Sequence, residues 1–442
     1  MAEREKFGSG AAVMMAMAGS AIGLGNIWRF PYMVGEYGGA AFVVVYLLAT
    51  VLLSIPILLS ETVIGRHTHL GTVGSIDKIV PGSRLKLVGY LTVLSPLIIL
   101  SFYSVVGGWS IQFTLKSVTA GFGADATSIF GSFISSVWGP LACHTAFLLA
   151  TALIVSAGVK GGIEKFNKVC LPVLFVLIVA MAVYSVSLPG ASEGVRYLVK
   201  PDFSKLSAKS LSYAMGQSFF SLSLGVGTVL TYASYMKNEN SMLGTAFGTA
   251  IFDVLFAILA GFAVMPAVFA AGLEPAGGPG LIFESVPFIF SSMGAAAPLL
   301  SRIISIVFFV TIVIAALTSS ISMYEVGVAY LVENHRFSRR KAVIVIFLGT
   351  WALGILCSLS FGPLSGVHIL GRSIFDFCDA LTSNVLMTLG SLMFVFIAGW
   401  KMSREDVRRE FGGSRLFKPF YFMIRYVAPL GILLIFFTNI FV

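Results

Sequence analysis

Charged residues, cysteines and histidines are all scarce in this sequence. Only 11% of the 442 residues are Asp, Glu, Lys or Arg, whereas an ordinary soluble domain carries about 25%, so a soluble globular protein is excluded. The four cysteines show neither metal-ligand spacing nor a disulfide framework. The five histidines do not combine with serines or acids at a common depth, which argues against a membrane enzyme.

Apolar residues make up 57% of the chain, and the mean hydropathy is +0.93. A helix needs about 20 apolar residues to cross the hydrocarbon core of a bilayer. Eleven stretches meet this requirement: 10–34, 39–65, 87–117, 140–157, 167–188, 210–236, 242–271, 299–332, 341–361, 369–399 and 417–441. The sequence therefore predicts an all-α polytopic membrane protein with eleven transmembrane helices in a lipid bilayer.

The basic residues predict the orientation of these helices. The net charge is +9, but the basic residues are scattered over short loops rather than gathered on one domain, so we expect no nucleic-acid partner. Most of them lie on the side of the membrane that carries the N-terminus. By the positive-inside rule that side is cytoplasmic, and an odd number of spans puts the C-terminus outside. We expect a multi-pass protein of the cell (inner) membrane.

The first stretch, 10–34, is interrupted by GSAIGLGN at residues 19–26. Three glycines within seven residues disfavour a helix, and unwound backbone is tolerated in lipid only where it lines a cavity or is buried in protein. Freed carbonyl groups can hold a cation, and the N-terminus of a half-helix can hold an anion. Close helix packing would use the same small residues, and the residue types alone leave both interpretations open.

The sixth stretch, 210–236, has a second interruption, SLSLGVG at residues 221–227. The two interrupted stretches are five spans apart, so the two halves of the chain would have opposite orientations. Paired glycine-interrupted helices indicate an inverted-repeat transporter with its binding site at the bilayer midplane. We therefore expect a first five-helix repeat in 1–188, an outer loop in 189–209, an inverted second repeat in 210–400, and an inner loop with an eleventh helix in 401–442.

These motifs resemble the neurotransmitter:sodium symporter family, whose bacterial members are sodium-coupled amino-acid transporters. The resemblance runs from about Arg4 to Trp400 and rests on the following segments: GSAIGLGNIWRFPY (19–32), SLSLGVG (221–227), TYASY (231–235), GPGLIF (278–283), LTSS (317–320) and DFCDALTSN (376–384). It implies two five-helix inverted repeats with broken helices 1 and 6, to which the eleventh helix is an addition.

The resemblance also implies two sodium sites, built from the oxygen ligands that hard cations prefer. Site 1 would consist of the substrate carboxylate with Ala21 (through its carbonyl), Asn26, Ser221 and Asp253. Site 2 would consist of the carbonyl groups of Gly19, Ile22 and Ala315 and the hydroxyl groups of Thr318 and Ser319. Hydroxyl groups in apolar spans also bond back to their own helix, so the residue types by themselves leave site 2 open.

Asp253 lies in an otherwise apolar stretch. A carboxylate there costs roughly 2.5–3.5 kcal/mol on insertion scales and indicates a functional residue. Chloride-dependent relatives carry Asn at the position of Asp253 and a chloride-binding Ser at the position of Ala257. The resemblance thus implies that a fixed carboxylate supplies the charge that chloride brings elsewhere, and we expect two bound sodium ions and no chloride.

The same resemblance implies a substrate pocket. The amides of Leu24 and Gly25 and the hydroxyl of Tyr103 would hold a carboxylate, and the carbonyls of Ala21, Phe220 and Ser221 would hold an amine. The side-chain pocket would be lined by Ile99, Tyr103, Phe220, Ser223, Val226 and Met323. These residues are mostly apolar, and Gly23 replaces the amine-binding Asp of monoamine transporters, so we expect a hydrophobic L-amino acid, aliphatic or aromatic.

Gates are implied at both ends of the pocket. The outer gate would pair Arg29 with Asp379 across Tyr103 and Phe220, with Gln217 nearby. The inner gate would pair Arg4 with Glu333, together with Tyr235 and Phe7. Gly162 and Pro172 resemble a site of partial helix unwinding on the sodium-release path, although an ordinary helix start is the alternative. Glu61 matches a family glutamate that braces the broken first helix, and the sequence assigns no role to Glu325.

The favoured interpretation is sodium-coupled secondary active symport of a hydrophobic L-amino acid by alternating access, carried out by a monomer or weak dimer. A non-transporting amino-acid sensor on the same fold would have the same motifs. A proton-coupled transporter would be expected to lack the hydroxyl groups of site 2, and both are present. The sequence does not specify which amino acid is carried.

Overall fold

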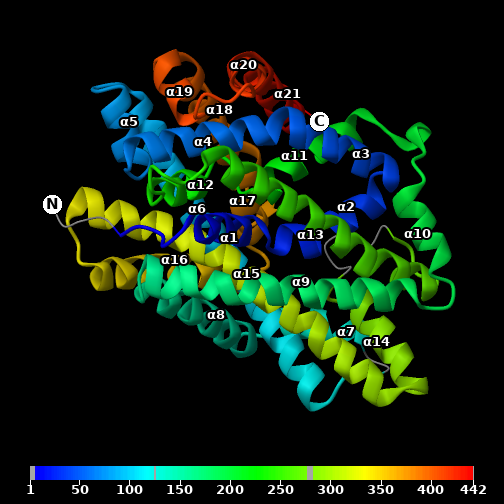
Figure 1. The fold of residues 1–442 in the computed structure, drawn as a ribbon. Coiled ribbons are helices and arrows are strands. Elements are labelled where there is room, and N and C mark those ends of the chain that lie inside the picture. The colour runs from blue at the N-terminus through cyan, green and yellow to red at the C-terminus, as the bar shows by residue number, and fades with distance from the viewer. Residues whose placement is uncertain (1–4, 124–125, 276–281, 442) are drawn as a thin grey trace.

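The computed structural model describes residues 5–123, 126–275 and 282–441. Most of its long helices run alongside one another (Figure 1). The β structure of the described residues is one antiparallel hairpin of β1 (His368–Ile369) and β2 (Arg372–Ser373). The predicted all-α class is therefore confirmed, apart from this hairpin.

Nine helices in the described ranges are long and apolar enough to cross a membrane. They are Ala40–Thr68, Leu85–Thr119 (α6), Trp138–Ser156 (α8), Val159–Val186, Met242–Ala270 (α13), Pro298–His335 (α15), Arg339–Leu359 (α16), Ile374–Lys401 and Phe417–Thr438. The composite spans contain α3 (Ala40–Ala49), η2 (Thr50–Ser54), α4 (Ile55–Thr68), η3 (Val159–Glu164), α9 (Lys165–Val186), α17 (Ile374–Ala380), η6 (Leu381–Leu386), α18 (Met387–Phe396), η7 (Ile397–Lys401), α20 (Phe417–Phe422), η8 (Met423–Val427) and α21 (Ala428–Phe441). The prediction for 369–399 began too early, because the hairpin precedes α17.

The first glycine-interrupted stretch is broken. It consists of α1 (Gly10–Ala21), a π-helical turn η1 (Gly25–Arg29) and α2 (Phe30–Glu36), and its two halves are bent by 49°. Counting this pair as one span raises the number of spans in the described residues to ten. The remaining predicted span, 210–236, is not a continuous helix.

That second interrupted stretch consists of α11 (Ala208–Ser221) and α12 (Thr228–Ser234). Residues 222–227 join them, and Gly225 and Gly227 there have φ angles of +79° and +71°, a region that side chains disfavour. Neither α11 nor α12 is long enough to cross a bilayer by itself. In the described part of the chain, the eleven expected spans therefore correspond to nine long helices, the bent pair of the first stretch, and one pair of short helices.

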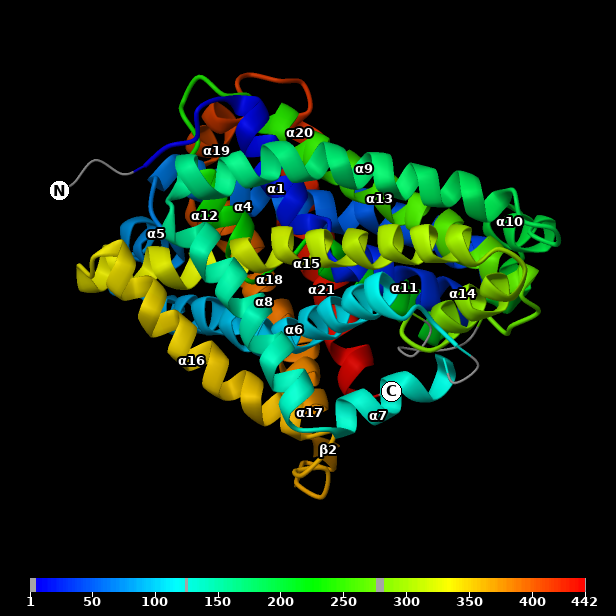
Figure 2. The same cartoon turned by 90° about the horizontal axis from the view of Figure 1, so that it is seen from below.

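Long helices surround both breaks. The helix α15 contacts α1, α6, α8, α9 and α16, while α1 also packs on α13 and α12 packs on α4. Figure 2 shows α9 and α15 running alongside each other next to α1. Residues on both sides of each break are buried. The unwound backbone is thereby kept away from lipid, where its free polar groups would be costly.

Short helices lie at the two ends of the bundle (Figure 1). The N-terminal segment and α5 (Thr72–Ile79) lie at one end, and the opposite end carries α7 (Ala126–Ser135), α10 (Ser192–Val199) and α14 (Ser285–Ala296). A 3-10 turn, η4 (Phe203–Lys205), follows α10. Most of the GPGLIF motif lies outside the described residues. Its last residue, Phe283, is buried, with its ring centroid 5.3 Å from that of Phe113.

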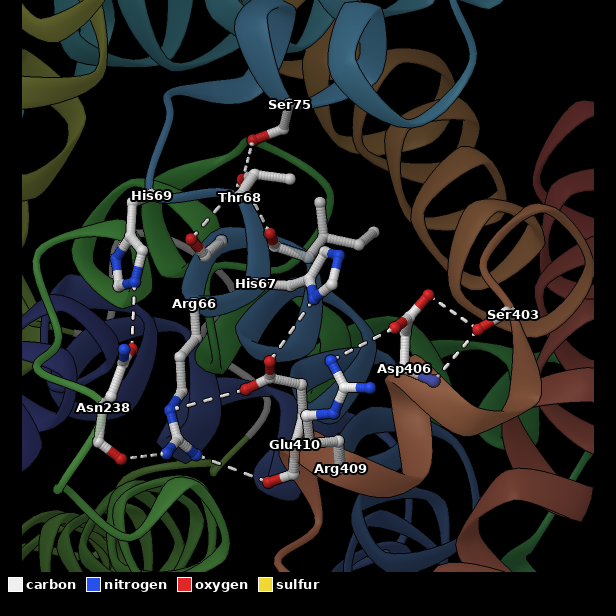
Figure 3. A network of polar contacts seen from close by, with 12 residues as sticks. Arg66, His67, Thr68, His69, Ser75, Asn238, Ser403, Asp406, Arg409 and Glu410 are labelled. Carbon is white, nitrogen blue, oxygen red and sulfur yellow. Dashed lines mark hydrogen bonds and ion pairs between the residues drawn. The ribbon is translucent and has the colours of Figure 1, made fainter.

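The helix α19 (Arg404–Glu410) is tied to the end of α4 by a polar network (Figure 3). Arg66 Nε lies 3.5 Å from Glu410 Oε2, and Arg66 Nη2 donates to the Asn238 carbonyl at 2.6 Å. His67 Nδ1 lies 3.4 Å from the other carboxylate oxygen of Glu410. The network joins three segments that are far apart in the chain, which is why the sequence pattern did not reveal it.

Candidate functional site

Hydrogen bonds join the two broken stretches directly. Ser223 Oγ donates to the Ser20 carbonyl at 3.1 Å, and Gln217 Nε2 donates to the Gly25 carbonyl at 2.9 Å. Asn26 Nδ2 donates to Ser221 Oγ at 3.1 Å. The breaks therefore face each other, and the carbonyl groups freed by one are partly satisfied by side chains of the other.

Asp253 of α13 is fully buried beside this junction. Ser221 Oγ lies 2.8 Å from each of its carboxylate oxygens, and Asn26 Nδ2 donates to Oδ1 at 2.8 Å. Tyr46 OH lies 3.4 Å from Oδ2. The sequence predicted Asn26, Ser221 and Asp253 as site residues, and the structure brings them together. The sequence analysis missed Tyr46, because in the sequence it is one more aromatic residue of an apolar span.

The partners of Asp253 are all neutral. Among the residues that the structure describes, no Lys, Arg or His nitrogen lies within 4.0 Å of this carboxylate. A buried charge without an ionic partner is strongly disfavoured. The carboxylate therefore suits a bound cation. Because no cluster of three His, Cys, Asp or Glu side chains occurs in the described ranges, neutral oxygens must supply most of the ligands of that cation.

A second group of oxygens lies where α15 meets the end of α1. Thr318 Oγ1 lies 3.1 Å from the Ile22 carbonyl oxygen and 2.9 Å from the Ala315 carbonyl oxygen, and its one hydrogen can be donated to either. Ser319 Oγ lies 3.3 Å from the same Ile22 carbonyl. A methyl group on Gly19 would lie 3.5 Å from Thr318 Cβ, so all five residues predicted for site 2 are neighbours.

A small cavity of about 30 Å³ lies between the two breaks. It is lined by Ala21, Gly23, Gly25, Ile99, Tyr103, Phe220, Ser223, Val226, Ser319, Met323 and Met387. Eight of the ten residues predicted to bind substrate are in this lining. Of the other two, the Leu24 amide donates to Tyr103 OH at 3.1 Å, and Ser221 bonds Asp253. The sequence missed Met387, which is brought in by α18.

The predicted outer gate is not formed as an ion pair. The Arg29 guanidinium lies 4.4 Å from the centroid of the Phe220 ring. Both gate residues belong to the described part of the chain, and no ion pair within 4.0 Å joins Arg29 to Asp379. Asp379 instead accepts a hydrogen bond from Ser383 Oγ at 3.0 Å. Gln217 bonds the first break rather than either charged residue.

Residues of the predicted inner gate cluster near the N-terminal segment. Phe7 is buried, and its ring makes edge contacts with Tyr232 and Tyr235 at centroid distances of 5.7 and 6.1 Å. Glu333 accepts the Gly71 amide at 2.7 Å. Arg4 lies outside the described residues, so its pairing with Glu333 stays a prediction.

Two carboxylates have partners that the sequence did not indicate. Glu61 is buried and accepts the Gly225 amide at 2.7 Å, so its hydrogen bond supports the second break rather than the first. Glu325 is buried and forms an ion pair with Arg339 at 2.6 Å. It also accepts from Tyr235 OH at 2.8 Å, which connects this pair to a residue of the inner gate.

We expect Glu325→Gln to lower the free energy of unfolding by about 3 kcal/mol, because Arg339 would keep a charge without its buried partner. The double variant Glu325→Gln/Arg339→Gln should recover most of this loss. Thermal unfolding in detergent measures both effects. Asp77→Asn, which removes the exposed partner of Lys86, is the control and should leave stability unchanged. Equal losses in the single and double variants would contradict this role for the pair.

Gly162 and Pro172 lie in an irregular part of the fifth predicted span. Gly162 belongs to the π-helical turn η3, and Pro172 lies inside α9. A Cβ on Gly162 would overlap the Ile154 carbonyl, so the close approach of the chain requires glycine there. The start of this span is therefore not an ordinary helix start, although α9 continues through the proline.

Comparison with known proteins agrees with these features. The model of the sodium:neurotransmitter symporter family matches residues 4–128 and 134–442. The sodium-dependent transporter YhdH of Bacillus subtilis is 36% identical over 432 residues, which is 96% of this chain and 95% of the relative. A sodium-dependent transporter of Haemophilus influenzae is 34% identical over 99% of both chains.

A solved structure shares the fold. The crystal structure of MhsT in complex with L-phenylalanine superposes with a TM-score of 0.92 at 41% sequence identity, and the match covers 99% of this chain and all of that one. The fold of this chain is thus shared, over almost its whole length, by a solved relative. The chain is a sodium-dependent, multi-pass membrane transporter that belongs to the sodium:neurotransmitter symporter family.

Proposed function

We propose that this transporter carries a hydrophobic L-amino acid together with two sodium ions, by alternating access and without chloride. The observation that carries this proposal is the buried Asp253 carboxylate, which lies between the two breaks and is paired only with neutral donors. A sodium ion supplies the missing positive charge there. A substrate carboxylate beside it completes the ligand set and couples the two species.

Site 1 is proposed to hold sodium through the Ala21 carbonyl, Asn26, Ser221 and Asp253. In the structure Asn26 turns its Nδ2 toward Asp253, and its Oδ1 accepts the Gly23 amide at 3.3 Å. Rotating this amide by half a turn presents Oδ1 to a cation. Site 2 uses the oxygens of Ile22, Ala315, Thr318 and Ser319 together with the Gly19 carbonyl. Both ligand sets consist of the oxygen atoms that a hard cation prefers.

The substrate is proposed to bind in the cavity between the breaks. The adjacent Leu24 amide and Tyr103 hydroxyl hold its carboxylate, with the Gly25 amide, and the carbonyls of Ala21, Phe220 and Ser221 hold its ammonium group. Apolar side chains of the lining receive the side chain. The phenylalanine bound to the structurally similar MhsT supports a hydrophobic amino acid as the substrate.

Chloride independence follows from the fixed charge of Asp253. Ala257, one helical turn further along α13, is buried and offers no hydroxyl for an anion. The inverted repeats 1–188 and 210–400 are proposed to rock about the site, with Arg29, Asp379 and Gln217 closing one side and Arg4, Glu333, Tyr235 and Phe7 the other. The N-terminus is proposed to be cytoplasmic and the C-terminus outside, in the cell membrane, in a monomer or weak dimer.

Uptake into proteoliposomes tests the proposal. We expect radiolabelled phenylalanine and leucine to accumulate under an inward sodium gradient, equally with chloride or gluconate, and not under a potassium gradient. Accumulation that needs chloride would overturn the role of Asp253. Accumulation driven by a proton gradient without sodium would overturn sodium coupling. Binding without accumulation would indicate a sensor.

A further inference from the structure

Asn167 is a buried polar residue on α9, just after the π-helical turn η3. Its Nδ2 donates to the Ile163 carbonyl at 2.9 Å, and this bond defines which end of the amide is nitrogen. The other end, Oδ1, is buried and has no hydrogen-bond partner in the described part of the chain. A buried acceptor without a donor is uncommon and calls for an explanation.

The oxygen of Asn167 lies against α1. A Cβ built on Gly19 would overlap Asn167 Oδ1 and would lie 3.5 Å from Thr318 Cβ. Gly19 and Thr318 are both proposed ligands of site 2. Only glycine at position 19 lets the Asn167 oxygen approach this closely, so α1 and α9 meet at an acceptor oxygen beside site 2.

Two acidic residues, Glu164 and Glu5, lie near η3, toward the end of the bundle that carries the N-terminal segment. Glu164 lies three residues before Asn167 and therefore on the same side of the helix; it accepts the Gly8 amide at 2.8 Å. Glu5 accepts the Val159 amide at the start of η3. Two carboxylates thus lie around η3, although Lys237 Nζ donates to the carbonyl of the same Gly8 at 3.3 Å. Carboxylates at this end of the bundle attract cations.

We propose that Asn167 Oδ1 is a transit ligand for sodium, which receives the ion as it moves between site 2 and the η3 end of the bundle. A carbonyl oxygen of an amide is a suitable sodium ligand, and the ion would satisfy the unpaired acceptor. The Nδ2 of the same amide holds the last turn of η3 through Ile163, so a change in η3 would turn the ligand. This inference rests on the proposed function, because it requires that site 2 binds sodium.

The test measures the dissociation rate and the equilibrium affinity of radioactive sodium on the purified transporter. Asn167→Leu removes the oxygen and keeps the volume, whereas Asn167→Asp keeps an oxygen in place. We expect Asn167→Leu to slow sodium dissociation roughly tenfold, with the sodium affinity changed less than about twofold, because a transit ligand stabilises the moving ion more than the bound one. Asn167→Asp should restore fast dissociation.

Ser185→Ala is the matched control, because Ser185 lies on the same helix and its Oγ is also buried and unpaired, but it is remote in sequence from η3. It should not change sodium release. Unchanged dissociation in Asn167→Leu, equal slowing in the control, or a loss of affinity that Asn167→Asp does not restore would overturn the proposal. Asn167→Ala takes the place of the leucine variant if that variant does not fold.

Thr318→Val, measured in parallel, separates this inference from the proposed function. If Thr318→Val leaves sodium binding unchanged, site 2 is wrong and the proposed function fails with it. If Thr318→Val weakens sodium binding while Asn167→Leu behaves like the parent, only the transit ligand is wrong.

Discussion

Replacing Asp253 by asparagine is expected to weaken sodium binding at least about a hundredfold, roughly 3 kcal/mol, and to abolish sodium-driven uptake. Asparagine has nearly the same shape but carries no charge, and its amide nitrogen would face Ser221 and Asn26, which now donate to the carboxylate. The cation would then lie in a buried site without a compensating negative charge. Direct binding of radioactive sodium and uptake into proteoliposomes measure the two effects.

A second substitution makes this prediction sharper. In the double variant Asp253→Asn/Ala257→Ser, the new hydroxyl would lie one turn along α13 on the same face as position 253. We expect uptake to recover in part with chloride and to stay absent with gluconate, because chloride would now supply the negative charge. Recovery that ignores chloride would contradict the charge argument.

A surface carboxylate provides the control for Asp253. Asp376 also accepts a serine hydroxyl, from Ser373 at 2.7 Å, but it is exposed. Asp376→Asn should therefore bind sodium and take up substrate like the parent protein. If Asp253→Asn, measured without chloride, bound sodium and took up substrate as well as this control, Asp253 would not be a sodium ligand.

Gly23→Ala is expected to reduce substrate binding by about fivefold to 150-fold, because overpacking a buried site costs roughly 1–3 kcal/mol. A Cβ at this position would overlap Ser319 Oγ and lie 2.7 Å from Tyr103 OH. Tyr103 would have to leave the Leu24 amide, which removes one of the proposed carboxylate-binding groups. Equilibrium binding of labelled phenylalanine measures the loss.

The matched control for Gly23 is Gly349→Ala on the exposed side of α16, where a Cβ meets no atom within 4 Å. It should bind substrate normally and unfold at the same temperature or slightly higher, because alanine favours a helix. If Gly23→Ala also bound substrate normally, the cavity would not be the substrate site.

The spans could be predicted from the sequence because the bilayer acts on each segment of the chain separately. Every spanning segment must satisfy its own backbone in hydrocarbon, so hydropathy alone located the nine long helices and the broken first stretch of the described residues. The glycines of 19–25 and 221–227 marked both breaks for the same reason, since unwound backbone needs a special environment wherever it occurs. The division into inverted repeats stays a prediction, because it concerns the relation between two sets of five helices. The properties of a single helix do not define that relation.

The pairing of side chains was decided by the tertiary structure. Asn26, Ser221 and Asp253 became one site only when η1, α11 and α13 packed together, and Tyr46 then joined them. Arg339 beside Glu325, Glu410 beside Arg66, and Asn167 against Gly19 have no signal in sequence spacing. By itself the sequence determined a chain of apolar helices with two breaks, because those properties depend on neighbouring residues. The pairing of each acidic side chain with a basic or polar partner depends on contacts between distant segments, and only the packed bundle specifies those contacts.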